Sequence, residues 1–122
     1  MGSGKSKAHV VKLRIDKVND KEEIVPLSDD GKPQRKRTVH ENDRIRWVGP
    51  HPGDKVVIRF RQEDDSPLEG KIGGTEFRKI VKPSNVSAGE RNREFRYDCE
   101  VTGADNKPVS WAGGGSVDVF FF

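Results

Sequence analysis

Residues 94–101 alternate strictly between two kinds of side chain. Phe95, Tyr97, Cys99 and Val101 are apolar or amphipathic, and every residue between them is charged. Because successive side chains of a strand point to opposite faces of its sheet, this segment is predicted to be a strand with one buried and one exposed face. Cys99 is the single cysteine of the chain, so no internal disulfide can form.

The same alternation recurs in shorter segments, most clearly at residues 10–18, 44–48, 55–61 and 116–122. Residues 23–27 are predicted to be a short edge strand limited by Pro26, and residues 75–81 an extended segment with Phe77 in the core. The glycines of 112–115 are predicted to be flexible. The chain has 13 glycines and seven prolines, and no long apolar stretch has a helical period. We therefore predict an all-β fold, a two-sheet Greek-key sandwich of about seven to eight strands.

The length of 122 residues is that of one domain. We expect residues 1–8 to be a disordered or tag-derived tail and residues 9–122 to form a single domain. The net charge is +3, with 23 basic residues set against 20 acidic ones. A mixed surface of this kind argues against nucleic acid as the partner, because nucleic-acid binders carry a clustered basic excess. No apolar run is long enough to span a membrane, and the cellular compartment stays open.

The order of motifs from Asn42 onward resembles that of a cupredoxin, the blue-copper sandwich fold. Residues 42–48 (NDRIRWV) are similar to the family's entry strand, and the Tyr97-Asp98-Cys99 segment is similar to its cysteine-bearing strand. Residues 115–119 (GSVDV) are similar to the family's last strand. The resemblance covers about two thirds of the chain and implies a cupredoxin-like sandwich.

The copper ligands of that family are incomplete in this sequence. A blue-copper site needs a thiolate and two imidazoles, often with an axial thioether. The residues after Cys99 contain neither histidine nor methionine, and His51 lies in the loop before the expected ligand strand. We therefore expect a domain without copper or other cofactor, in which Cys99 packs in the core. The alternative is a copper or redox site of unusual form built from His51, Cys99 and His40.

Seven residues are the candidates for binding. Outward arginines on neighbouring strands would merge into one stripe suited to oxyanions, unless acidic residues on the same face pair with them. His51 lies between two prolines, and Trp111 either caps the core or projects from a loop as a contact for a partner. The candidates are Arg44, Arg46, Arg59, Arg61, Arg96, His51 and Trp111.

The leading functional hypothesis is a non-catalytic interaction module that binds a protein or an anionic ligand through its loops or its arginine-bearing face. The sequence contains no Ser/His/Asp set, paired acid and base, or metal-ligand spacing of the usual kinds. Besides the copper alternative, an anion- or nucleic-acid-binding domain stays open. Self-association is predicted through Phe120 and Phe122, which share one face of the last strand.

Overall fold

The computed structural model describes residues 6–61, 66–69, 76–84, 86–103 and 110–121. These residues form eight strands and contain no helix, which confirms the all-β prediction. Residues 1–5 of the predicted tail lie outside the described part. The strands are β1 (Ala8–Val18), β2 (Lys21–Pro26), β3 (Lys36–His40), β4 (Arg44–Val48), β5 (Lys55–Phe60), β6 (Arg78–Lys79), β7 (Asn92–Thr102) and β8 (Ser110–Phe120).

The strands make one continuous mixed sheet that curls into a half-barrel. Seven strands follow the order β5-β7-β8-β2-β1-β4-β6, and β3 pairs with β8 beside this path. The predicted two-sheet Greek-key sandwich is therefore wrong, and its cupredoxin-like form is not supported. β2 was predicted at an edge, yet it pairs with both β1 and β8 and lies inside the sheet.

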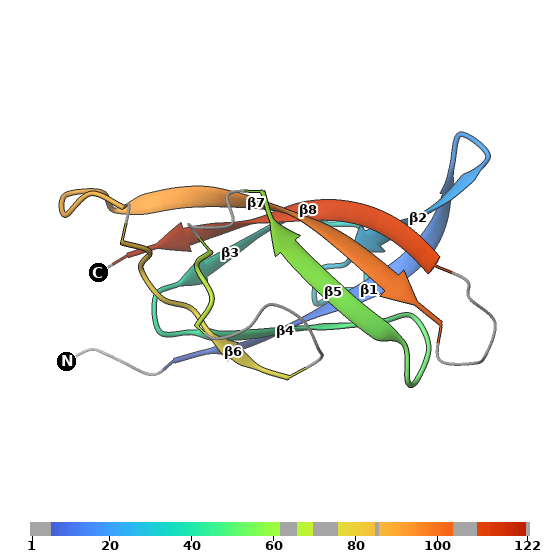
Figure 1. The fold of residues 1–122 in the computed structure, drawn as a ribbon, viewed down its shortest axis with the longest axis horizontal. Helices are drawn as coiled ribbons and strands as arrows, with labels where there is room; N and C mark the ends of the chain where they lie inside the picture. Colours follow the sequence, from blue (N-terminus) through green and yellow to red (C-terminus); the bar gives the residue numbers. More distant parts are fainter. Residues whose placement is uncertain (1–5, 62–65, 70–75, 85, 104–109, 122) are drawn as a thin grey trace.

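Strand β1 keeps the sheet continuous because it changes partners along its length. Residues 8–12 pair with β4 in parallel, and residues 13–18 pair with β2 in antiparallel orientation. Figure 1 shows β1 running from the level of β4 to the hairpin with β2 at the upper right. In a two-sheet sandwich the hydrogen bonding between strands would be interrupted between the two sheets. Here it is continuous, because β1 is long enough to pair with β4 over one half and with β2 over the other.

The core lies in the concavity of the curled sheet. The Trp47 ring of β4 packs edge-on against Tyr97 of β7, with ring centroids 5.4 Å apart. Tyr97 also packs against Phe60 of β5 at 5.9 Å. Since β4 and β7 are far apart in the strand order, this contact closes the half-barrel. Each large side chain buried in this way contributes roughly 1.5–3 kcal/mol to stability.

The three consecutive glycines lie inside strand β8, so the prediction of a flexible segment at 112–115 is wrong. A Cβ on Gly113 would collide with the carbonyl group of Ile24, and one on Gly115 would lie 2.6 Å from the Tyr97 hydroxyl. Strand β8 pairs with β2, β3 and β7. Glycine is required here because neighbouring backbone and the Tyr97 ring approach the strand too closely for any side chain.

A buried carboxylate anchors the start of β1 to the turn before β4. Asp43 accepts hydrogen bonds from the backbone N–H groups of Lys7 and His40, and its Oδ2 lies 2.8 Å from Nε2 of His9. Burial alone would raise the pKa of Asp43, but these hydrogen bonds outweigh it and hold that pKa below its ordinary value. The anchor thereby sets the position of β4 relative to β1.

Candidate functional site

Strand β4 presents two arginines on the convex side of the sheet. Its inward residues Ile45 and Trp47 are buried, so Arg44 and Arg46 on the opposite face point outward. The pairing of β4 with β6 sets Arg44 directly opposite Lys79, and directly opposed residues of two paired strands share a face. Both predicted arginines of β4 therefore belong to one surface together with a lysine of β6.

An exposed aromatic ring lies under both guanidinium groups. The Arg46 Cζ atom is 4.8 Å from the centroid of the Phe77 ring, and the Arg44 Cζ atom is 5.6 Å from it. Phe77 is 38% exposed, so its predicted place in the core is wrong. Among the described residues 76–81 of the segment predicted to be extended, Arg78 and Lys79 form strand β6, which leaves Phe77 beyond its end. Such stacking holds a guanidinium plane in place and is worth about 0.5–1 kcal/mol at an exposed site.

The same surface extends to β1. Lys12 is exposed and lies beside Val48 in the parallel pairing of β1 with β4. We call this surface the β4–β6 cationic face, defined as Lys12, Arg44, Arg46, Phe77 and Lys79.

The cations of this face have no acidic partner among the residues that the structure describes. In the part of the chain that the structure describes, no carboxylate lies within 4.0 Å of the charged nitrogens of Lys12, Arg44, Arg46 or Lys79. The Nε atom of Arg46 is also buried without a hydrogen-bond partner among the same residues. Buried donors in proteins nearly always have a partner. The face thus offers positive charge that no described carboxylate compensates, whereas the buried Nε of Arg46 is out of reach of a ligand.

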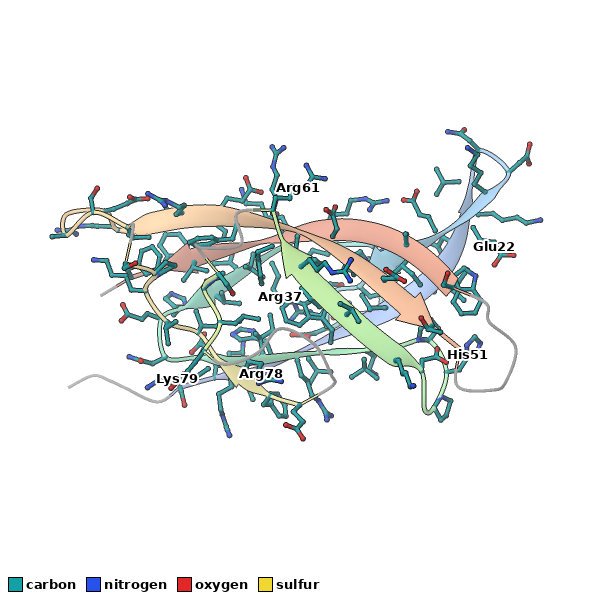
Figure 2. All side chains as sticks on the ribbon, viewed as in Figure 1. Glu22, Arg37, His51, Arg61, Arg78 and Lys79 are labelled. Carbon is teal, nitrogen blue, oxygen red and sulfur yellow. The ribbon has the colours of Figure 1, made fainter. Side chains whose placement is uncertain are left out.

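Arg59 of β5 and Arg61, which directly follows β5, lie elsewhere and are compensated by carboxylates of β7. Arg61 is 3.2 Å from Asp98, and Arg59 is 4.0 Å from Glu100, both across the β5–β7 pairing. Arg96 is exposed on the same face of β7, opposite Ser116 of β8. Arg61 and Lys79 appear on opposite sides of the molecule in Figure 2. The condition for one stripe of all these arginines, that their strands be neighbours, is not met, because β4 and β5 lie toward opposite ends of the strand order.

His51 and Trp111 are brought together, although the sequence suggested no link between them. Their ring centroids are 6.2 Å apart. Trp111 is half-buried against the core, and its Nε1–H donates a 2.8 Å hydrogen bond to Glu22 near the start of β2. Glu22 and His51 lie at the same end of the molecule in Figure 2. Of the two alternatives that the sequence left open, Trp111 thus packs against the core.

The loop that carries His51 also forms a pocket. The pocket has a volume of about 380 Å³, and its lining includes Arg46, Val48, Pro50 and Pro52. The Asp54 carboxylate, almost fully buried, accepts a 3.0 Å hydrogen bond from the His51 N–H and fixes the turn. The outward face of β4 therefore leads from its arginines directly into a preformed pocket.

The environment of Cys99 is that of a packing residue. It is 2% exposed, and burial raises the pKa of its thiol to about 11. His9 contacts Asp43, whereas His40 stacks on Phe120 and His51 faces Trp111. The described residues contain no group of three His, Cys, Asp or Glu side chains that could hold a metal ion.

The predicted self-association surface is only partly described. Phe120 is 39% exposed and stacks on His40 with ring centroids 5.6 Å apart. Phe122 lies outside the described residues, so self-association through this strand stays a prediction.

Sequence reasoning missed Phe77, Lys79 and Lys12 as members of the site. The alternation in β4 placed its two arginines outward, but alternation carries no information about which strand lies alongside. The alternation within β1 could have placed Lys12 on the exposed face from the sequence. The pairing of β6 with β4 depends on tertiary contacts and could not be read from the sequence.

Comparison with known proteins assigns this chain to no family. No family model matches it, and no curated protein matches it in a sequence search. The described residues also include no helix of the length and apolarity needed to cross a membrane. The geometry of the surfaces is therefore the basis for inferring function.

Proposed function

We propose that the protein is a non-catalytic binding module that holds an anionic ligand on the β4–β6 cationic face. The observation that carries this proposal is the pair Arg44 and Arg46, which are stacked on one exposed ring and lack an acidic partner among the described residues. A guanidinium group binds carboxylate or phosphate oxygens through two parallel N–H donors. The face matches a ligand that carries such groups.

Preorganisation favours binding at this face. A free arginine side chain loses rotamer freedom when it binds, which costs about 0.5–1.5 kcal/mol for each immobilised side chain. Stacking on Phe77 has already restricted both guanidinium groups, so part of this cost is met in the unbound protein.

The arginines of β5 serve as an internal comparison. Arg59 and Arg61 would have to give up Glu100 and Asp98 before they could bind an external anion. Those carboxylates would also repel the ligand. The two pairs of arginines carry the same formal charge, so any difference in binding between them reflects environment and not net charge.

The experiment compares two double variants of equal charge change. Fluorescein-labelled hexaglutamate is titrated with wild-type protein, with Arg44→Gln/Arg46→Gln and with Arg59→Gln/Arg61→Gln, at low and at physiological ionic strength. We expect the β4 double variant to weaken binding by about 10–100-fold, a total of about 1.4–2.8 kcal/mol, which is the range of one net hydrogen bond to a charged group. The β5 double variant should bind within about twofold of wild type, since its pairs are exposed. Equal losses in both variants, or no measurable binding by wild-type protein, would refute the proposal.

A further inference from the structure

We infer that the ligand is an extended acidic segment of another protein, and that one of its apolar side chains enters the pocket beside Val48. This inference rests on the proposed function, because the arginines of the β4–β6 cationic face supply the anchor. Beyond the proposed function, the inference names the class of the partner and the order in which the side chains of that partner meet the face.

The order follows from the geometry of β4. Arg44, Arg46 and Val48 are successive outward residues of one strand, so their Cα atoms are roughly 6.7 Å apart along it. An extended peptide lying along β4 repeats its same-face side chains at the same interval. Two acidic residues in alternate positions would meet the two arginines, and the next residue on that face would lie above the pocket. The matching pattern is acidic-x-acidic-x-apolar, in either chain direction.

The pocket suits an apolar side chain. Its lining combines the half-buried Val48 and Pro50 with the exposed Pro52, and Arg46 forms the boundary with the cationic part of the face. The nearby Asp54 carboxylate is 2% exposed and already accepts the His51 N–H, so it presents little charge to an incoming group. A positive φ of 82° at Gly53 and the Asp54 hydrogen bonds preform the loop.

Charge and composition favour a protein over a nucleic acid. Single-stranded nucleic acids are held by several aromatic platforms along a basic groove, whereas Phe77 is the one aromatic member of this face. A short acidic segment with an apolar anchor fits within the face.

The test uses synthetic peptides as probes. Labelled Glu-Gly-Glu-Gly-Leu and its reverse, Leu-Gly-Glu-Gly-Glu, are compared with the same peptides carrying serine in place of leucine. We expect leucine to increase affinity by about tenfold in at least one direction, which corresponds to burial of most of its side chain. Val48→Asn should remove this gain, and Val57→Asn, a matched change of a half-buried outward residue on β5, should preserve it.

Backbone amide chemical shifts of the wild-type protein give a second readout that needs no variant. The leucine peptide should shift the amides of residues 48–54 more than the serine peptide does, with equal shifts at Arg44 and Arg46. If the acidic peptides bind through the arginines without any gain from leucine, the inference fails and the proposed function stands. If neither peptide binds, both fail. Tighter binding of a short oligothymidine than of either leucine peptide, lost in Arg44→Gln/Arg46→Gln, would assign the face to nucleic acid and overturn the inference.

Discussion

The imidazole of His9 and the carboxylate of Asp43 meet in a buried contact, with Nε2 and Oδ2 2.8 Å apart. The same carboxylate accepts the N–H groups of Lys7 and His40. A single side chain thus satisfies donors from both sides of the junction between β1 and β4. Its loss leaves several of them without an acceptor in a site where water has little access.

We predict that Asp43→Ala lowers the free energy of unfolding by about 3 kcal/mol, the usual effect of stranding buried donors. Asp98→Ala, which removes the exposed partner of Arg61, should cost less than about 1 kcal/mol. Urea unfolding at neutral pH measures both. If both variants lower the free energy of unfolding equally, the buried hydrogen bonds of Asp43 stabilise the protein no more than an exposed ion pair does.

The Asp43 contribution should also depend on pH in a defined direction. The pKa of this carboxyl is lowered in the folded protein, whereas in the unfolded chain it is about 3.9. The stabilisation is therefore complete above about pH 5 and is lost as pH falls through the unfolded and then the folded pKa. The difference in unfolding free energy between wild type and Asp43→Asn should shrink over that acidic range. A difference that grows on acidification would contradict the assignment.

Gly115 is predicted to tolerate no side chain. A Cβ there would lie 2.6 Å from the Tyr97 hydroxyl and 2.7 Å from the Arg35 carbonyl oxygen, and one of these atoms is backbone. Gly115→Ala should lower the free energy of unfolding by about 2–3 kcal/mol, the cost of overpacking. Gly89→Ala is the control, because nothing lies within 4 Å of its added Cβ. Thermal or urea unfolding of the two variants should differ clearly, and equal midpoints would place Gly115 in open space.

Cys99 should be inert to alkylation in the folded protein. Its thiol has a pKa of about 11 because of burial, so very little thiolate exists at pH 8. We expect iodoacetamide to react at least about 100-fold more slowly with native protein than with protein in urea, as thiolate fraction and access both fall. Fast native alkylation would contradict this expectation. An intense copper–thiolate absorption band that is lost in Cys99→Ser would instead support the copper alternative.

Phe77 should contribute to binding and little to stability. Removing the ring in Phe77→Leu releases both guanidinium groups, so hexaglutamate affinity should fall by about two- to fivefold, the equivalent of about 0.5–1 kcal/mol. Phe120→Leu is the matched control, since Phe120 is 39% exposed against 38% for Phe77 and stacks on His40 instead. Unchanged affinity in Phe77→Leu would show that the arginines need no support from the ring.

The sequence predicted which face of a strand each side chain occupies far better than it predicted which strands lie side by side. Alternation correctly placed Cys99 in the core and Arg44 and Arg46 on the surface, because side-chain direction is a local property of an extended chain. The closure of the sheet could not be predicted in this way, since the exchange of partners along β1 depends on residues distant in sequence. The error at Phe77 has the same origin, as β6 is only two residues long.

The glycines of β8 show a different limit. Glycine-rich sequence is typical of flexible segments, and local propensity alone disfavours a strand there. Tertiary contacts decide otherwise, because Tyr97 covers Gly115 and the backbone of β2 approaches Gly113. The sequence likewise could not show which arginines have an acidic partner, because the carboxylates beside Arg59 and Arg61 lie on another strand.

The change of partners along β1 also bears on the order of folding events. The β4 strand obtains its longest ladder by pairing in parallel with β1, and parallel pairing requires closure of a long loop. Pairings of this kind form slowly compared with hairpins such as that of β1 and β2. We therefore expect the binding arginines to reach their final positions late, so that hexaglutamate binding recovers after Cys99 has become protected during refolding. Simultaneous recovery in a stopped-flow and pulsed-alkylation experiment would show that the binding face forms together with the core.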